Sequence, residues 1–171
     1  MSDLLKAAQA YADFLKALGL NSSNAHINIE ESAHHAAELM AAWMSGVDAD
    51  PPHLSLMPAS EEGKVSLRDL PFYSFCGHHF VPFFGTVSIE YYPSRKIAGL
   101  GGFCRVIDHF SRRPQFQEYL CKQIATHLFE ELNPKALRVK LNARQMCLEL
   151  EGKGAGICVE TVQVLGDKSL F

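Results

Sequence analysis

A cysteine and a histidine stand three residues apart in Cys76-Gly77-His78-His79, between two segments that have the patterns of strands. In a turn, the side chains of Cys76 and His79 can converge on one ion without straining a regular strand. A thiolate combined with an imidazole favours zinc. The alternative is a half-buried thiol with two histidines hydrogen-bonded at a hairpin corner. Spacing alone leaves both interpretations open.

A zinc site here needs a third protein ligand. Three protein ligands would leave a fourth position for water, as in catalytic zinc sites. Cys104 and Cys121 fall on apolar helix faces, where a small buried thiol is the commoner explanation. Cys147 lies on a predicted strand that can run beside the strand leading to Cys76. Spacing does not choose among the candidates, which are Cys104, Cys121, Cys147, Cys158, His109 and His127.

Gln117 and Glu118 begin a predicted helix directly after Arg112-Arg113-Pro114. A glutamate near a helix N-terminus interacts favourably with the helix dipole, which is sufficient reason for its presence. A carboxylate beside an amide can also read the N–H and C=O edge of guanine. On chemistry alone the first explanation is preferred.

The elements that position these residues follow from hydrophobic periodicity. Helical spacing predicts helices near residues 4–18, 30–43, 100–110 and 115–132, with Ser2 as a cap of the first and Pro114 at the start of the last. Alternation predicts strands at 65–75, at 86–92, from 137 towards 150, and at 157–165, whereas the proline-rich segment 47–64 is predicted to be a loop.

The order after residue 64 is strand, strand, helix, helix, strand, strand. It predicts an α+β fold with an antiparallel four-stranded sheet and two helices on one face. Residues 1–63 form a helical N-terminal arm and linker in this interpretation, and residues 64–171 form the main domain.

Composition limits the function classes. The chain has 171 residues and a formal net charge of −3, without the basic excess of a nucleic-acid binder. Charged residues interrupt the apolar N-terminal stretch, so neither a signal peptide nor a membrane partner is expected. Five widely spaced cysteines suit a reducing compartment better than a disulfide framework, which predicts a cytoplasmic protein.

Two features predict a homo-oligomer. The sheet face opposite the helices needs a cover, most simply another subunit. The aromatic-rich stretch FYSFCGHHFVPFFG would be costly to leave exposed to water in a monomer.

The motifs resemble those of GTP cyclohydrolase I, a zinc enzyme family of the tunnelling-fold (T-fold) superfamily. The likeness is carried by CGHHFVPFFGTVSIEYYP, AGLGGFCRVIDHFSRRPQFQEYL and QMCLELEG, and it covers residues 65–152 closely. The resemblance implies ββααββ units that assemble into toroids with active sites between subunits. By position, it also implies that the zinc ligands are Cys76, His79 and Cys147, and that His78 is a second active-site histidine. It implies further that Gln117 and Glu118 read guanine, and that Leu100 and Arg105 bind the substrate.

The same resemblance implies a reaction. In the family, zinc-activated water attacks C8 of the purine, the imidazole ring opens, formate leaves, and the product recloses as a dihydropterin triphosphate. Zinc suits this chemistry because it lowers the pKa of bound water. A small-molecule purine or pterin is therefore the expected partner.

The sequence departs from the family in two places. Gln145 stands where the family has a histidine that donates and accepts protons. Glutamine forms hydrogen bonds but does not titrate near neutrality, and losses of general acid–base catalysis cost ~10²–10⁴-fold. The phosphate contacts are also altered: Gly101-Gly102 replaces Ser-Lys, Leu54 and Glu151 each replace an arginine, and only Arg105 remains of the basic set. A triphosphate is normally held by Arg and Lys.

Three hypotheses follow. The first is a divergent GTP cyclohydrolase I that makes a pterin precursor. The second is a T-fold zinc hydrolase that acts on a guanine base, nucleoside or pterin without a triphosphate. The third is a non-catalytic binding or regulatory subunit that retains zinc for structure. Three protein ligands argue against the third hypothesis, because structural zinc is usually closed by four.

Overall fold

The structure is a computed structural model that describes residues 3–59 and 63–171. Backbone proximity divides the chain into two units, Met1–Ser45 and Gly46–Phe171. The division falls before residue 63, where we placed the boundary, because much of the linker belongs to the second unit. The Gly46 N–H donates to the Arg112 carbonyl at 3.0 Å, and strand β1 (Leu56–Pro58) pairs with strand β4 (Lys96–Ala98).

The first unit consists of helices α1 (Leu4–Ala17), α2 (Ser22–Ala25) and α3 (Ile29–Trp43). Helices α1 and α3 bury a small apolar cluster formed by Ala12, Ile29 and Ala33. Ser2, which we expected to cap α1, lies outside the described residues. The Asp3 side chain accepts a hydrogen bond from the Lys6 N–H and caps that helix.

The second unit is built on a five-stranded sheet of order β5-β2-β3-β6-β7. The long strands β2 (Val65–Cys76), β3 (Pro82–Tyr92), β6 (Ala136–Gln145) and β7 (Cys158–Gly166) pair antiparallel throughout. The two-residue strand β5 (Pro114–Gln115) adds a parallel edge beside β2. The predicted antiparallel four-stranded sheet and the α+β class are therefore confirmed.

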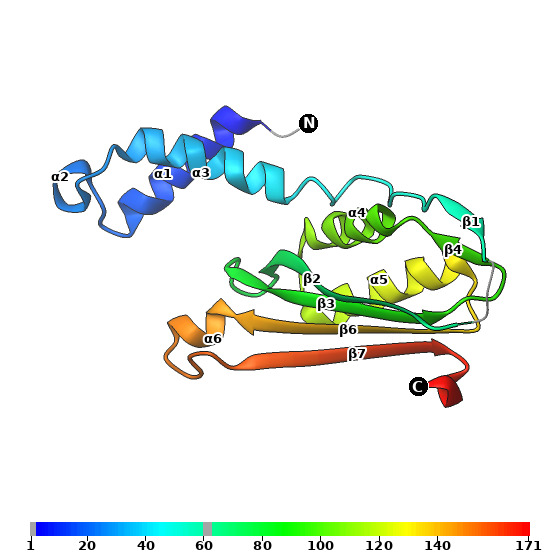
Figure 1. Cartoon of the computed structure of the whole chain (residues 1–171). Helices are drawn as coiled ribbons and strands as arrows, with labels where there is room; N and C mark the ends of the chain where they lie inside the picture. Colours follow the sequence, from blue (N-terminus) through cyan, green and yellow to red (C-terminus); the bar gives the residue numbers. More distant parts are fainter. Residues whose placement is uncertain (1–2, 60–62) are drawn as a thin grey trace. The chain divides into compact units, whose positions relative to one another are not determined.

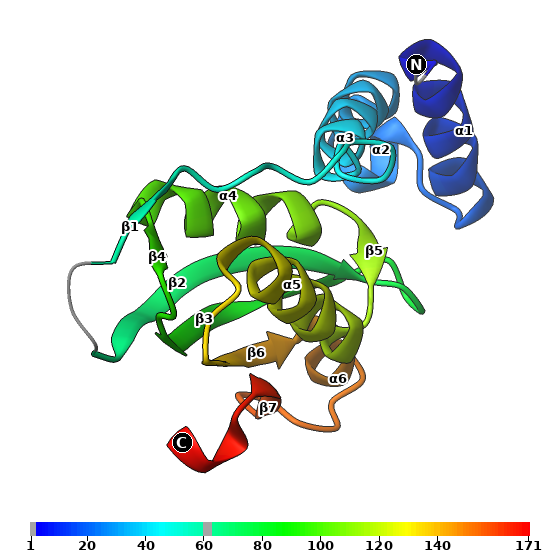
Figure 2. The same cartoon turned by 90° about the vertical axis from the view of Figure 1, so that its right-hand side faces the viewer.

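Helices α4 (Leu100–Ser111) and α5 (Gln117–Leu132) cover one face of this sheet (Figures 1 and 2). The core lies between them and the sheet, and its fully buried side chains include Val87, Ile89, Phe103, Leu120 and Leu141. This arrangement agrees with the predicted pair of helices on one face. Within the described residues, no helix is at once long and apolar enough to cross a membrane.

Three local expectations were wrong. Pro114 does not start a helix, because its segment pairs with the end of β2 and α5 begins only at Gln117. The strand predicted to run towards residue 150 ends at Gln145, where the chain turns into the short helix α6 (Met146–Leu150). The predicted loop at 47–64 contains β1.

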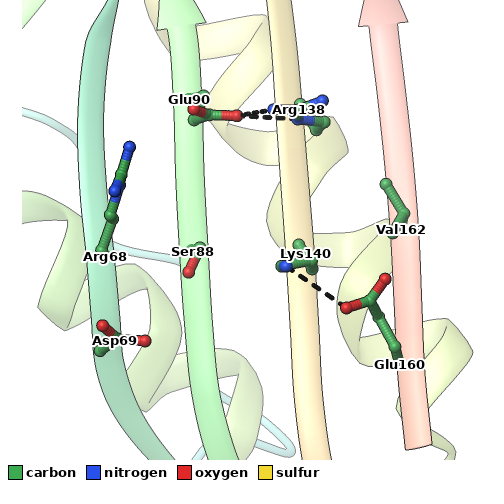
Figure 3. A pocket seen from close by; sticks show the side chains of 8 residues that line it. All are labelled: Arg68, Asp69, Ser88, Glu90, Arg138, Lys140, Glu160 and Val162. Carbon is green, nitrogen blue, oxygen red and sulfur yellow. Dashed lines mark hydrogen bonds and ion pairs between the residues drawn. The ribbon is translucent and has the colours of Figure 1, made fainter. Parts of the chain in front are cut away.

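The sheet face away from the helices carries many charged side chains. Figure 3 shows charged side chains from β2, β3, β6 and β7 on this face, with helices behind the sheet. Burial alone would raise the pKa of Glu90, but Arg138 and Lys64 outweigh it and lower that pKa to about 2. Lys140 forms an ion pair with Glu160 at 3.3 Å. The residues of these ion pairs are among those that line a cavity of ≈ 480 Å³.

Charged side chains do not need an apolar cover, but Val162 on the same face is 43% exposed, so this face does not decide our first reason for a homo-oligomer. Our second reason agrees with the exposure of Tyr73 and Phe80 of the aromatic stretch, which are 56% and 53% exposed. The homo-oligomer stays a prediction.

Candidate functional site

The turn between β2 and β3 brings Cys76 and His79 together. The Cys76 N–H donates to the Val81 carbonyl, and the Phe80 N–H donates to the Cys76 carbonyl, both at 2.9 Å. Phe80 takes a left-handed conformation with φ 53°, which few non-glycine residues adopt. The resulting tight turn leaves the Cys76 Sγ and the His79 Nδ1 3.7 Å apart.

The side chains of this turn fit a metal ion. The possible ligand atoms of Cys76, His78 and His79 all lie within 4.8 Å of one another, and the described residues contain no second group of this kind. Zinc–sulfur and zinc–nitrogen bonds at a tetrahedral angle place the two donors roughly 3.5 Å apart. The 3.7 Å between Cys76 and His79 agrees with that separation, and the thiol and imidazole donors are those that zinc prefers.

Cys147 reaches this turn by a route that we did not predict. It lies in α6 rather than on a strand, and β6 pairs with β3 instead of β2. Figure 1 shows α6 and the β2–β3 turn at the same end of the sheet. Burial raises the pKa of the Cys147 thiol, and the charge of Cys76 and a hydrogen bond with Cys76 raise it further. Both thiols line the cavity described below, whereas the ligand atoms that lie within 4.8 Å of one another are those of Cys76, His78 and His79.

The other candidate ligands lie elsewhere. Cys121 is fully buried, its Sγ donates to the Val139 carbonyl at 3.5 Å, and burial raises its pKa to about 12. It is a core thiol, as the apolar helix face indicated. Cys104, for which we expected the same, is exposed, so that prediction was wrong. Four candidates remain, and none of them lines the cavity described below: Cys104, Cys158, His109 and His127.

The segment around β5 places the start of α5 beside the turn. The Ser74 hydroxyl donates to the Arg113 carbonyl at 3.2 Å, and the Gly77 N–H donates to the Gln115 carbonyl at 3.0 Å. The Gln115 side chain in turn donates to the Phe110 carbonyl. These bonds anchor β5, which comes two residues before α5, so that the first turn of the helix faces the Cys76 region.

A cavity of ≈ 320 Å³ forms where these elements meet. It brings together every predicted site residue except Leu100 and Arg105. No lysine or arginine is among its lining residues, which are Cys76, His78, His79, Gln115, Phe116, Gln117, Glu118, Gln145, Cys147, Leu148 and Val159. The larger cavity on the polar sheet face contains paired charges and neither cysteine nor histidine.

Gln117 is buried and fully engaged within the protein. Its Nε2 donates to the Val159 carbonyl and to the Thr161 hydroxyl, both at 2.8 Å, and lies 3.4 Å from the Leu141 carbonyl. Its Oε1 accepts a hydrogen bond of 2.7 Å from the Gln145 Nε2. Glu118, by contrast, is exposed at the cavity.

Sequence reasoning missed four residues that line this cavity, and two of them, Gln115 and Phe116, come directly before α5. The Phe116 ring lies against His78, with centroids 4.5 Å apart. Gln115 is buried, and its Oε1 has no hydrogen-bond partner among the described residues. Both fall in a segment that we predicted as helix, and only the pairing of β5 with β2 shows that they face the site.

Leu100 and Arg105 belong to a second region, at the start of α4. A Cβ on Gly102 would lie 2.8 Å from the Leu54 Cδ2, and a Cβ on Gly101 would lie 3.6 Å from the Arg105 Nη1. Leu54 is buried here, whereas Arg105 is exposed. We call Leu54, Gly101, Gly102 and Arg105 the α4-entry cluster; none of them lines the cavity.

Glu151 lies close to the cavity, at the end of α6. Its carboxylate forms an ion pair with Lys153 at 2.6 Å. The hydrogen bond from Lys153 lowers the pKa of Glu151 most, and the charge of His79 makes a smaller contribution in the same direction. The negative charge that the sequence predicted here is therefore present, with Lys153 beside it.

Comparisons with known proteins identify the family of the chain. The family model for GTP cyclohydrolase I matches residues 7–169. A curated protein named GTP cyclohydrolase 1 from Streptococcus thermophilus (strain CNRZ 1066) is 37% identical over 155 residues, covering 89% of this chain and 82% of the relative. A protein of the same name from Streptococcus pyogenes serotype M18 is 36% identical over 150 residues, covering 86% and 76%.

Among solved structures, an archaeosine synthase QueF-Like in the apo form is similar to this chain at 18% sequence identity. The match covers 69% of this chain and 98% of the other, with a TM-score of 0.43.

Proposed function

Since the chain belongs to the GTP cyclohydrolase I family, we propose that it is a zinc-dependent cyclohydrolase. It would open the imidazole ring of a guanine-type purine at C8, release formate and form a pterin. One observation supports this proposal above all: the paired thiol and imidazole of Cys76 and His79 line the same cavity as the Glu118 carboxylate.

Cys76, His79 and Cys147 would hold the metal. Zinc, when bound, supplies a Lewis acid that lowers the pKa of water to near neutrality. His78 projects from the same turn and lies against Phe116, which limits the orientations of its ring. It is therefore the titratable group best placed to exchange a proton with a ligand at C8.

Glu118 would orient the purine. A carboxylate accepts two parallel hydrogen bonds, and guanine offers two adjacent donors at N1 and its 2-amino group. The resemblance also assigned guanine reading to Gln117. The Gln117 amino group already donates to Val159 and Thr161. We therefore assign recognition of the two guanine donors to Glu118 alone.

A second candidate function is favoured by the charges around the cavity. No lysine or arginine lines it, and the Leu54–Gly102 contact occupies positions where the resemblance expects cations. A triphosphate carries several negative charges, which arginine and lysine normally bind. A guanine nucleoside, base or pterin without a triphosphate is therefore the alternative substrate.

Active sites between subunits remain part of the proposal. Leu100 and Arg105 do not line the cavity of their own chain, so a substrate-binding role for them requires a second copy of the chain. The homo-oligomer predicts a mass several times 19.0 kDa in light scattering. A monomer that turns over substrate would remove Leu100 and Arg105 from the site.

The decisive experiment compares substrates. Zinc-loaded protein is incubated with GTP, GMP, guanosine and guanine, while formate release and pterin fluorescence are followed. Turnover of any of them supports the cyclohydrolase, and efficient turnover of GTP alone rejects the loss of triphosphate recognition. No reaction with any of the four, at one zinc per chain, would favour a different purine or pterin as substrate, or the non-catalytic binding subunit.

A further inference from the structure

The orientation of the Gln117 amide is set by its partners. A backbone carbonyl oxygen only accepts hydrogen bonds, and the Val159 carbonyl lies 2.8 Å from the Gln117 Nε2. A reversed amide would place two oxygens against each other at that distance and would lose the donor to Leu141 as well. The side chain is also only 4% exposed, so water cannot compensate for the loss. The Gln117 Oε1 must therefore face Gln145.

This orientation determines what Gln145 offers to a ligand. Only an N–H of Gln145 can donate to the Gln117 Oε1, and the observed distance is 2.7 Å. The Gln145 carbonyl oxygen then lies on the other side of its amide and has no hydrogen-bond partner among the described residues. Gln145 lines the cavity. Gln145 therefore brings to the lining of the cavity a carbonyl oxygen that no described residue uses, on an amide whose orientation Gln117 fixes.

We propose that Gln117 is a positioning residue that holds the Gln145 carbonyl oxygen towards the ligand, and that this oxygen accepts a hydrogen bond from the N7–H of the hydrated purine. The proposal rests on the proposed function. It gives Gln145 a role that requires no titration, and it gives Gln117 a role that acts through Gln145.

The chemistry of hydration explains why an acceptor is useful here. In an intact guanine, N7 carries a lone pair that repels an amide oxygen. When water adds across the N7=C8 bond, its oxygen bonds to C8, the π electron pair moves to N7, and N7 gains a proton. N7 is then a donor, and it keeps its N–H in the ring-opened formamide. The Gln145 oxygen thus binds the adduct better than the substrate, which is the condition for catalysis.

The position of Gln145 in the chain is consistent with contact at N7. C8 must lie near Cys76, His79 and Cys147 for hydrolysis, and Gln145 is two residues before Cys147 in the same cavity. Two ring nitrogens are bonded to C8. In a nucleoside one of them, N9, carries the sugar, so N7 is the nitrogen that can become a donor beside C8.

Two inert nucleosides test the proposal on the zinc-loaded full chain. 8-Oxoguanosine has an N7–H donor, whereas 7-deazaguanosine has a C–H at that position, and neither undergoes hydration at C8. Calorimetry gives the ratio of their dissociation constants. We expect wild type to prefer 8-oxoguanosine at least ~10-fold, as for one hydrogen bond gained in a buried site. Gln145→Met should reduce this preference about 10-fold without changing the affinity for 7-deazaguanosine. Any contribution of the C8 oxygen, which only 8-oxoguanosine has, is common to wild type and variant.

Further variants distinguish positioning from general damage. Gln117→Met should reduce the preference as Gln145→Met does, and the double variant should reduce it no further, because both act at one contact. Gln123→Met is the control on the same helix; it faces a different groove and should leave the ratio unchanged. Thr161→Val serves as a second variant in case Gln117→Met does not fold. It keeps Gln117 but removes one of its acceptors, and should give a ratio of dissociation constants between those of wild type and Gln145→Met.

The outcomes separate the two proposals. If wild type binds neither nucleoside, the guanine site is wrong, and the role of Gln145 fails with it. If both nucleosides bind and Gln145→Met keeps the preference, the role of Gln145 is wrong while the proposed function stands. If Gln145→Met lowers the preference but Gln117→Met and Thr161→Val both keep it, Gln117 does not position Gln145.

Discussion

The cavity at the β2–β3 turn and the α4-entry cluster lie in the same unit but differ in chemistry. Both correspond to segments that resemble the GTP cyclohydrolase I family. The cavity keeps thiols, imidazoles and a carboxylate in one place. The α4-entry cluster instead has a buried leucine against a glycine, with a single exposed arginine beside them.

The difference follows from how the side chains in each region are held. In the cavity, Gln145 is held by Gln117, which is held by the strand carrying Val159. One substitution there leaves buried groups without partners, which is costly. In the α4-entry cluster, Leu54 and Gly102 touch only through van der Waals contact. Such a pair can change together without stranding any hydrogen bond.

The largest effect should come from removing a metal ligand. We expect Cys147→Ala to lower zinc affinity more than about 100-fold. Loss of a residue that only hydrogen-bonds to a metal ligand already costs up to about 100-fold, and loss of a ligand itself should cost more. Turnover should fall with zinc content, measured by elemental analysis and formate release. Cys104→Ala is the matched control, because that exposed thiol lies on α4 outside the cavity. Full zinc occupancy in Cys147→Ala would leave His78 as the third ligand.

A smaller but selective effect is expected at Glu118. Glu118→Gln removes the charge and one acceptor that face the ligand, which should weaken guanosine binding about 10–100-fold, as for charged hydrogen bonds worth ~1.5–3 kcal/mol. Zinc content should stay at one per chain, because Glu118 is not a ligand. Calorimetry with guanosine, alongside elemental analysis, checks both statements. Unchanged guanosine affinity would show that the purine edge lies elsewhere.

Local spacing predicted one part of the site, and long-range pairing determines the rest. Cys76 and His79 share a turn, so their convergence is encoded within four residues. Cys147 reaches Cys76 only because β6 pairs with β3 and then ends in α6. The Gln117–Gln145 bond spans 28 positions and depends on the register of β6 and β7. The hydrophobic periodicity of the sequence does not determine that register.

The fold shows the same division between local and long-range information. The order of strands and helices follows from periodicity, which the core confirms. Pro114 misled the prediction, because proline is favoured both at the first position of a helix and at the start of an edge strand. Pairing of Pro114 with Phe75 decides in favour of the strand. That pairing is also what places Gln115 and Phe116 at the site.

A stability experiment sharpens the account of the α4-entry cluster. In wild type, Gly102→Ala places a methyl group 2.8 Å from the Leu54 Cδ2 and should cost about 1 kcal/mol of unfolding free energy by overpacking. In a Leu54→Ala background the same change should instead raise the unfolding free energy, by at most about 1 kcal/mol, because alanine is a better helix former than glycine. Urea unfolding of the four proteins measures both signs. Equal effects in the two backgrounds would mean that Leu54 does not require glycine at 102.

The smallest effect is expected at Arg105, the last cation of the α4-entry cluster. If the cluster no longer binds phosphate, Arg105→Ala should change the affinity for GTP less than about threefold, whereas one working arginine–phosphate pair is worth at least ~10-fold. The ratio of GTP to guanosine affinity, measured by calorimetry at one fixed salt concentration, isolates this contribution from purine binding. Lys140→Ala, on the polar sheet face, controls for the loss of one positive charge. A tenfold drop specific to Arg105→Ala would show that this single cation still binds the triphosphate, and the contrast between the two regions would then be one of degree.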